Sequence, residues 1–226
     1  SIDEGRLIVD ERIKLSEIIF VCTPVSTIDR IVRNVFPFLT ENSIITDVGS
    51  VKNCFSKKTY SLFKKKACLI PGHPIAGTEF SGARYAQKDL FKNKWCILTP
   101  KKKNNSVIML ASIWKKIGMK ISIMTAEEHD KIMSITSHLP HLIAFTIVGT
   151  AFNIDVKKKK ELINYSAGGF KDFTRIGSSD PKMWSDIFIY NKKHMLKTLD
   201  NFLKDLKTIQ ILIKNDEQEK IFDLLK

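Results

Sequence analysis

Short apolar runs alternate with amphipathic stretches through the first half of the chain. Five runs rich in Ile, Val, Leu and Phe have the length of β-strands and lie at residues 17–23, 43–48, 67–70, 95–99 and 120–124. After the first run, apolar residues recur at helical spacing at Ile28, Ile31, Val32 and Val35. A second amphipathic stretch occupies residues 107–117. This alternation predicts a mainly parallel, wound α/β sheet.

The hydrophobic pattern changes to a helical one after residue 124. Thr125 has the features of a helix N-cap, and Glu128, three residues later, would complete a capping box. The apolar helical pattern then continues, and Pro140 should kink this helix or leave carbonyl groups free. From Trp184 to the end, Leu and Ile recur near heptad spacing, which predicts a long helix that packs on another helix or another subunit. The predicted domains are therefore residues 1–124 and an all-α domain at 125–226.

Composition indicates an ordinary globular protein. Of the 226 residues, 43% are hydrophobic and 27% are charged. The chain has no uninterrupted apolar run of about 18 residues and does not begin like an export signal, so we expect no membrane span and a cytoplasmic location. The four cysteines lack the paired spacing of a zinc site, and we expect reduced thiols: Cys22, Cys54, Cys68 and Cys96.

The net charge of +13 raises the alternative of nucleic-acid binding. However, 31 of the 37 basic residues are lysines, and their runs fall at predicted helix ends or in loops. Nucleic-acid recognition relies on arginine and on aromatic side chains interleaved with the basic ones, and the lysine runs lack both. We therefore interpret the lysines as solvated surface and expect no nucleic-acid partner.

Arg175 stands out against this lysine-rich background. It is the only arginine after Arg84. Two-pronged binding of a carboxylate is a physical reason to use arginine where lysine would not substitute. A structural ion pair with Asp172 or Asp180 is the alternative, and the residues alone leave both interpretations open.

The first candidate for chemistry is His73, which follows the apolar run at 67–70 between Gly72 and Pro74. A side chain at the carboxyl end of a strand in an open α/β sheet lies where such folds bind ligands. A neutral imidazole held there can accept a proton from a substrate hydroxyl near neutral pH. The alternative is a turn histidine that bonds only a backbone carbonyl.

Several segments together extend this hypothesis. They are Asp-Val-Gly-Ser-Val-Lys (47–52), Gly-His-Pro-Ile-Ala-Gly-Thr-Glu (72–79), Ser-His-Leu-Pro-His (137–141), Gly-Gly-Phe-Lys-Asp-Phe-Thr-Arg (168–175) and Ser-Asp-Pro-Lys-Met-Trp (179–184). In this order the chain resembles the prephenate dehydrogenase family of tyrosine biosynthesis. The resemblance implies an oxidoreductase that oxidatively decarboxylates prephenate to 4-hydroxyphenylpyruvate with hydride transfer to NAD. It also implies a Rossmann-like dinucleotide-binding domain, a helical substrate-binding and dimerisation domain, and a homodimer.

The resemblance carries roles for individual positions. Its catalytic positions are His73, which would take the proton of the substrate hydroxyl, and Ser50, which would bond the same group near the nicotinamide. Its substrate-facing positions are His141, Arg175, Gly168, Thr78 and Trp184. Its cofactor-facing positions are Thr23, Pro24, Gly49 and Ser50.

Some of these positions have other interpretations. Ser50 is also a candidate N-cap for a helix after Val51. Trp184, which the resemblance directs towards the neighbouring subunit's site, could be core packing. Glu79 and Asp130 are weaker candidates beside the site. His138 and His141 lie three residues apart, but without the carboxylate of a zinc motif, so we expect no metal.

One expected unit does not occur in the sequence. A dinucleotide-binding fold normally opens with a strand, a Gly-x-Gly-x-x-Gly turn and a helix, and this chain lacks that motif. We therefore expect a sheet without its first βαβ unit, and a chain that is inactive if that unit is missing from the protein. Without that unit the choice of NAD or NADP cannot be inferred. Two alternatives stay open: an arogenate dehydrogenase, and a non-catalytic remnant or regulatory helical dimer.

Overall fold

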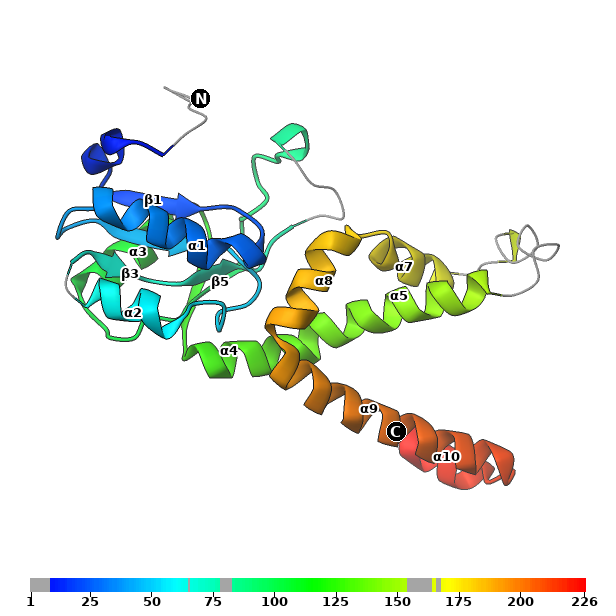
Figure 1. The fold of residues 1–226 in the computed structure, drawn as a ribbon. Helices are drawn as coiled ribbons and strands as arrows, with labels where there is room; N and C mark the ends of the chain where they lie inside the picture. Colours follow the sequence, from blue (N-terminus) through cyan, green and yellow to red (C-terminus); the bar gives the residue numbers. More distant parts are fainter. Residues whose placement is uncertain (1–8, 65, 78–82, 154–163, 166–167) are drawn as a thin grey trace.

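Strands and helices alternate in the first part of the chain, and helices form the second part (Figure 1). The structure is a computed structural model that describes residues 9–64, 66–77, 83–153, 164–165 and 168–226. Within these residues the last strand ends at Ile123, as the change in hydrophobic pattern predicts.

The strands form two neighbouring three-stranded groups. In the first, β1 (Ile18–Val21), β2 (Ile44–Asp47) and β3 (Cys68–Leu69) are parallel and lie in that order. In the second, β5 (Trp95–Leu98) pairs in parallel with β6 (Lys120–Ile123) and antiparallel with the short β4 (Gly72–Pro74). The predicted mainly parallel sheet is confirmed, and β4, which the apolar pattern did not predict, is its antiparallel exception.

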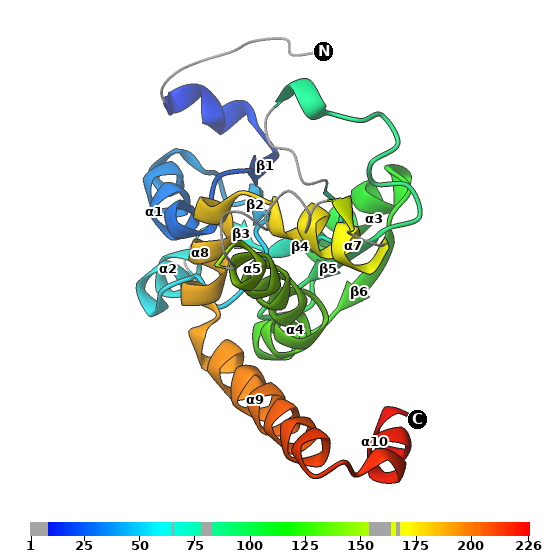
Figure 2. The same cartoon turned by 90° about the vertical axis from the view of Figure 1, so that its right-hand side faces the viewer.

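Helices cover both faces of the strands. Side chains alternate along β2, so that Ile45 packs with α1 (Val25–Val35) and α2 (Lys57–Phe63), whereas Ile44 packs with α3 (Asn105–Lys116). Figure 2 shows α1 and α2 on one side of the strands and α3 on the other. Three short 3₁₀ turns complete this part: η1 (Glu11–Leu15), η2 (Phe36–Phe38) and η3 (Ala83–Tyr85). The arrangement is a wound α/β layer with a separate core on each face.

The helical part begins with the predicted capping box. Thr125 accepts a hydrogen bond from the Glu128 amide (3.1 Å), and the Glu128 carboxylate accepts one from the Thr125 amide (2.8 Å), so α4 spans Ala126–Met133. Next come the π-helical turn η4 (Ser134–His138) and α5 (Leu139–Phe152). Pro140 lies in the first turn of α5 and has no amide hydrogen to donate backwards, which explains why the hydrogen-bonding pattern changes here.

Further helices follow α5. These are α7 (Gly168–Gly177), which packs directly against α5, α8 (Pro181–Tyr190), α9 (Lys192–Lys214) and α10 (Gln218–Leu225). The prediction of a single long helix after Trp184 is wrong, because α8, α9 and α10 divide this segment. Asn191 ends α8 because its buried side chain bonds the neighbouring helix, and Asp216, with φ of 55°, ends α9. In Figures 1 and 2, α9 projects away from the rest of the molecule, and α10 turns back and contacts α9.

Helix α8 joins the two parts by packing on α1. Tyr190 donates a hydrogen bond to the Ser26 carbonyl (3.2 Å), and Ser26 donates one to Asp186. The continuous helix Ala126–Phe152 has the length and composition that would allow it to cross a membrane, in contrast to our expectation from the sequence. Its buried His129, Asp130 and His138 instead bond other parts of the protein, as described below.

Candidate active site

His73 lies in β4, opposite Ile97 of β5, and only 8% of the residue is exposed. The alternative of a turn histidine that bonds only a backbone carbonyl is therefore wrong, because the segment pairs as a strand and the ring contacts another histidine. Gly72 explains the close approach of β4 to β2: a Cβ atom there would lie 3.1 Å from the Asp47 carbonyl oxygen. The backbone thus holds His73 at the end of β2.

A buried ion pair fixes this contact between strands. Lys52 donates hydrogen bonds to the Asp47 carboxylate and to the Gly72 carbonyl, and both charged side chains are fully buried. The Asp47 carboxylate also accepts from the amides of Gly49 (2.9 Å) and Gly72 (3.2 Å). Because each charge is satisfied, removal of either partner would leave the other buried and unpaired.

The ring of His73 contacts a second histidine from the helical part. Its Nδ1 lies 2.8 Å from Nε2 of His129, and Nδ1 of His129 lies 2.7 Å from a carboxylate oxygen of Asp130. The Asp130 carboxylate also accepts from the amides of Lys52 and Asn53, each at 2.8 Å. One carboxylate of α4 therefore ties the end of β2 to the histidine that contacts His73.

His138 and Asn191 extend the cluster. Asn191 donates to Nδ1 of His138 (3.0 Å) and to the Asp130 carbonyl (2.8 Å). The ring of His138 is fully buried and lies beside the backbone of Ser50. Within the described chain, its Nε2 makes no hydrogen bond of good geometry, although the nearby Ser50 backbone favours the protonated ring. A buried nitrogen of this kind is a candidate for contact with a ligand or a bound water.

Two of the substrate-facing positions implied by the family, His141 and Trp184, lie next to this cluster. The rings of His141 and Trp184 are stacked with centroids 3.7 Å apart, and His138 meets Trp184 edge-on at 6.2 Å. Trp184 thus contacts the site of its own chain, where it is also part of a buried core cluster. Arg175 lies on α7, which packs against α5, the helix that carries His141, and the Arg175 charge lowers the pKa of His141.

The surroundings keep three of these imidazoles neutral at pH 7. Burial lowers the pKa of His73 well below 6.5, and positive charge on the neighbouring side chains of His129, Lys52 or His138 acts in the same direction. Burial lowers the pKa of His138 to about 4, although Asp130 opposes this change. Burial and then the Arg175 charge lower the pKa of His141, against a hydrogen bond to the Ser137 carbonyl. His73 therefore has the protonation state that a general base requires.

The predicted cofactor-facing positions follow two neighbouring strands, and two other predicted positions lie outside the described residues. Thr23 and Pro24 follow β1, and Gly49 and Ser50 follow β2, so these four lie at the carboxyl ends of adjacent parallel strands. Thr78 and Glu79 lie outside the described residues. Ser50 does not cap a helix, because α2 begins at Lys57 with Ser56 as its N-cap, and that alternative is wrong.

Two of the substrate-facing positions are exposed. Gly168 begins α7, where an added Cβ atom would meet no other atom within 4 Å. The Arg175 side chain is 58% exposed, and its guanidinium lies 4.0 Å from the Asp172 carboxylate. An exposed ion pair at this distance contributes little to stability. The guanidinium is therefore not committed to a structural role.

Inference from the sequence missed His129 and Lys52. The signal for His129 was available in part, since residues 129, 130, 133, 134 and 138 are the buried positions of one helix face and include three ionisable side chains. Lys52 carried no such signal, because lysine is the commonest charged residue of this chain and is normally exposed.

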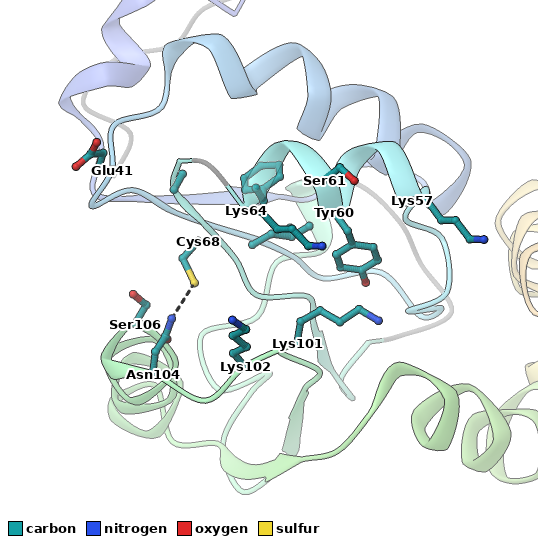
Figure 3. Close-up of a pocket in the computed structure, with 13 residues that line it drawn as sticks. Glu41, Lys57, Tyr60, Ser61, Lys64, Cys68, Lys101, Lys102, Asn104 and Ser106 are labelled. Atoms are coloured by element: carbon teal, nitrogen blue, oxygen red, sulfur yellow. Dashed lines mark hydrogen bonds between the residues drawn. The ribbon is translucent and has the colours of Figure 1, made fainter.

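A cavity of about 970 Å³ lies elsewhere, between α2, β3 and the segment that precedes α3 (Figure 3). Its lining is basic and includes Lys57, Lys64, Lys101 and Lys102, and the Lys101 ammonium lies 4.6 Å from the centre of the Tyr60 ring. No residue of the His73 cluster lines this cavity. Among the described residues, no three His, Cys, Asp or Glu side chains are grouped to hold a metal ion.

A wound α/β layer binds its ligands beyond the carboxyl ends of its strands, and this chain places a buried histidine there, at the junction with the helical domain. Residues 6–123 match the nucleotide-binding domain of prephenate dehydrogenase, and residues 125–226 match its dimerization domain. The chain belongs to the prephenate dehydrogenase family.

Individual relatives agree with this assignment. The chain is 32% identical to cyclohexadienyl dehydrogenase of Zymomonas mobilis over 96% of its own length and 75% of the relative's. It is 31% identical to prephenate dehydrogenase of Bacillus subtilis, over 95% of its own length and 58% of that protein. The chain thus spans less than two thirds of some curated relatives.

Solved structures show the same architecture. The prephenate dehydrogenase of A. aeolicus, in complex with hydroxyphenyl propionate and NAD+, has a TM-score of 0.86 and 36% identity, over 99% of this chain and 78% of that chain. Synechocystis arogenate dehydrogenase has a TM-score of 0.80 and 29% identity, over 95% and 77% of the two chains.

Proposed function

We propose that the protein oxidises and decarboxylates prephenate to 4-hydroxyphenylpyruvate, with NAD as hydride acceptor, in tyrosine biosynthesis. The observation that carries this proposal is a buried, neutral His73 whose Nδ1 is already engaged, in a cluster that continues through His138 and Trp184 to His141 and Arg175. Family membership and the likeness to a structure that holds NAD+ and a phenolic acid support the assignment.

His73 would handle one proton in this reaction. Its Nε2 takes the proton of the ring hydroxyl as the hydride leaves the same carbon. The carbon–carboxylate bond then breaks, its electron pair enters the ring, and carbon dioxide leaves. His73 returns the proton to the new phenolic oxygen. Atoms and charge balance without a net proton, so the imidazole must be neutral at the start.

The strand ends suit a nicotinamide ring. The residues at the ends of β1 and β2 that we assign to the cofactor, Thr23, Pro24, Gly49 and Ser50, are small and uncharged. At Gly49 a Cβ atom would lie 2.7 Å from Ile28 Cδ1, so a larger residue there would force the buried Ile28 side chain to shift. NAD bound there would supply the hydride acceptor. Ser50, between this turn and His138, would orient the substrate hydroxyl.

We assign substrate binding to residues of the helical domain. Arg175 would bind a substrate carboxylate with two parallel donors, and His141, stacked on Trp184, would face the same group. Gly168 would leave room for the substrate, and Thr78 would lie at the edge of the site. In this proposal residues 1–124 bind the cofactor, and residues 125–226 bind the substrate and the second subunit.

A homodimer fits the unpartnered apolar surface of the last helices. Side chains at least half exposed on α9 and α10 include Leu196, Leu203, Ile211, Ile213, Phe222, Leu224 and Leu225. Exposed large apolar side chains in this number are typical of a subunit interface. Four free cysteines in the structure are compatible with the cytoplasm, where we place the enzyme.

Arogenate is the second candidate substrate, because an arogenate dehydrogenase shares this fold with a TM-score of 0.80. Arogenate carries an amino group in place of the side-chain keto group of prephenate. The form of residues 168–173 and the presence of His141 favour prephenate.

Formation of NADH by the natural full-length protein, assayed with both substrates, tests the proposal. We expect kcat/KM for prephenate to exceed that for arogenate. A tenfold preference for arogenate would reverse the assignment, and no turnover of either would favour a non-catalytic dimer.

In the active protein, His73→Asn should lower kcat by about 10²–10⁴-fold and leave KM nearly unchanged, because it removes the base and nearly keeps the volume of the side chain. An unchanged kcat would exclude His73 as the base.

A further inference from the structure

A chain of three buried side chains runs from Asp130 through His129 to His73. The two contacts are 2.7 Å, from Asp130 to Nδ1 of His129, and 2.8 Å, from Nε2 of His129 to Nδ1 of His73. Asp130 and His129 are fully buried, and they belong to α4, whereas His73 belongs to β4. The contact therefore exists only in the assembled tertiary structure.

Hydrogen-bond chemistry restricts how protons occupy this chain. An ionised carboxylate only accepts, so Nδ1 of His129 donates to Asp130. Burial raises the pKa of Asp130, but hydrogen bonds from the His129 side chain and from the amides of Lys52 and Asn53 outweigh burial and hold it below its usual range. Asp130 is thus ionised at neutral pH and keeps the proton of His129 on Nδ1.

The role of His73 as a base determines which nitrogen donates the hydrogen bond between His73 and His129. Nε2 of His73 can receive a proton only if the ring hydrogen is on Nδ1. That hydrogen then points at Nε2 of His129, which accepts it. We propose that His129, oriented by Asp130, is a positioning residue that sets the tautomer of His73 and stabilises the imidazolium formed when His73 takes the substrate proton.

This role differs from that of the Asp47–Lys52 pair. Lys52 bonds the backbone of Gly72, and its ammonium charge disfavours a cationic His73. His129 bonds the imidazole itself and connects it to a carboxylate. The inference rests on the proposed function for its kinetic consequence, but the tautomer of His73 can be measured without any substrate.

The first test is ¹⁵N NMR of the natural full-length protein with labelled histidine, in which loss of a signal in His73→Asn assigns the His73 ring. We expect the hydrogen of His73 on Nδ1 and a bare Nε2. In His129→Phe, where Nδ1 loses its acceptor, the hydrogen should move to Nε2 or be shared. A hydrogen on Nε2 of His73 in the unaltered protein would overturn the proposal.

The second test is kinetic. His129→Phe should lower kcat by about 10–10³-fold, with KM within about threefold, because the base is misoriented while substrate contacts remain. The acid limb of the kcat/KM profile should move to lower pH, since the imidazolium of His73 loses its acceptor. The other ionisable groups around the His73 ring, Lys52 and His138, and Cys96 on the adjacent strand, are unchanged in this variant.

Two further variants separate positioning from structure. His129→Gln retains an oxygen near the Nε2 position and should recover a substantial part of kcat. His194→Phe makes the same change at another buried histidine of the helical domain, which contacts Glu127 and lies outside the cluster, and it should leave kcat and the pH profile unchanged. Equal losses in His129→Phe and His129→Gln, or a His129→Phe enzyme with normal kcat, would contradict the role. An inactive unaltered protein would instead contradict the proposed function. The NMR measurement of the His73 tautomer would then still test whether His129 positions His73.

Discussion

At the scale of single residues, the site combines buried groups that are fully bonded with exposed groups that are not. Asp47, Lys52 and Asp130 have their charges satisfied by ring nitrogens, amides or each other. Arg175, in contrast, has a largely exposed side chain, and its ion pair with Asp172 is long and lies within its own helix. The first group holds the segment of His73 in place, whereas the Arg175 guanidinium faces solvent.

Arg175→Ala should therefore raise KM for prephenate strongly and lower kcat much less. A desolvated charge pair with the substrate carboxylate is worth roughly 2–5 kcal/mol, or tens to thousands of fold in affinity. The melting temperature should change little, because the guanidinium is largely exposed. Arg175→Lys should recover only part of the affinity, since an ammonium cannot present two parallel donors. A normal KM in the alanine variant would refute the carboxylate-binding role, and a lowered melting temperature with normal KM would indicate a structural ion pair.

At the scale of elements, α4 and the π-turn determine where the helical residues meet the sheet. The capping box starts α4 at Ala126 and so sets which face of the helix carries His129 and Asp130. The π-turn adds a residue to the helical turn before Pro140, which shifts the face of α5 that carries His141 relative to that of α4. Both devices therefore align the helix with the ends of β2 and β4.

Thr125→Ala should lower the free energy of unfolding by about 1 kcal/mol, because the Glu128 amide loses its side-chain acceptor. Thr125→Ser keeps the hydroxyl and is the matched control. Urea unfolding of the three proteins measures the difference. Equal stabilities of the alanine and serine variants would show that the cap contributes nothing.

At the scale of the whole molecule, the site exists because the helical domain docks on the carboxyl ends of the strands. Contacts of α8 with α1 and of α4 with the segment after β2 bring Ser50, His73, His138 and Trp184 into one cluster. Docking also buries several histidines in neutral form, and such burial lowers the stability of the folded protein in acid.

The pKa of His138 is about 4 in the folded protein and about 6.5 when unfolded. The unfolded chain therefore binds more protons between these values, and stability decreases as pH falls from 6.5 to 4, by a total on the order of 3 kcal/mol from this group. Above pH 6.5 His138 is neutral in both the folded and the unfolded state, so it no longer changes the stability. His138→Asn retains an acceptor for Asn191 but does not titrate, so its free energy of unfolding should fall less steeply over this range. Denaturant titrations at several pH values give both slopes, and identical slopes would contradict the assignment. His73 and His141 are present in both proteins and cancel in the comparison.

Much of this architecture could be predicted from local pattern alone. The apolar runs and helical spacing identify the parallel strands, the covering helices and the change to helices after residue 124, because burial of one face imposes a period on the sequence. The motifs also identified the family and led to His73, Ser50, His141, Trp184 and Arg175 as candidates. The structure brings the first four together, and Arg175 lies on α7, which packs against the helix that carries His141. Their individual roles stay predictions.

Other features depended on contacts between segments far apart in sequence. Strand β4 has three residues and owes its existence to pairing with β5, the break at Asn191 arises from bonds to Asp130 and His138, and the buried state of Lys52 follows from Asp47 and Gly72. Most of these partners lie far apart in the chain, so the local periodicity of the sequence does not indicate these contacts. The sequence by itself determined the family, the layers and the candidate base. Only the tertiary structure decided which residues surround that base, because 56 residues separate His73 from the imidazole that contacts it.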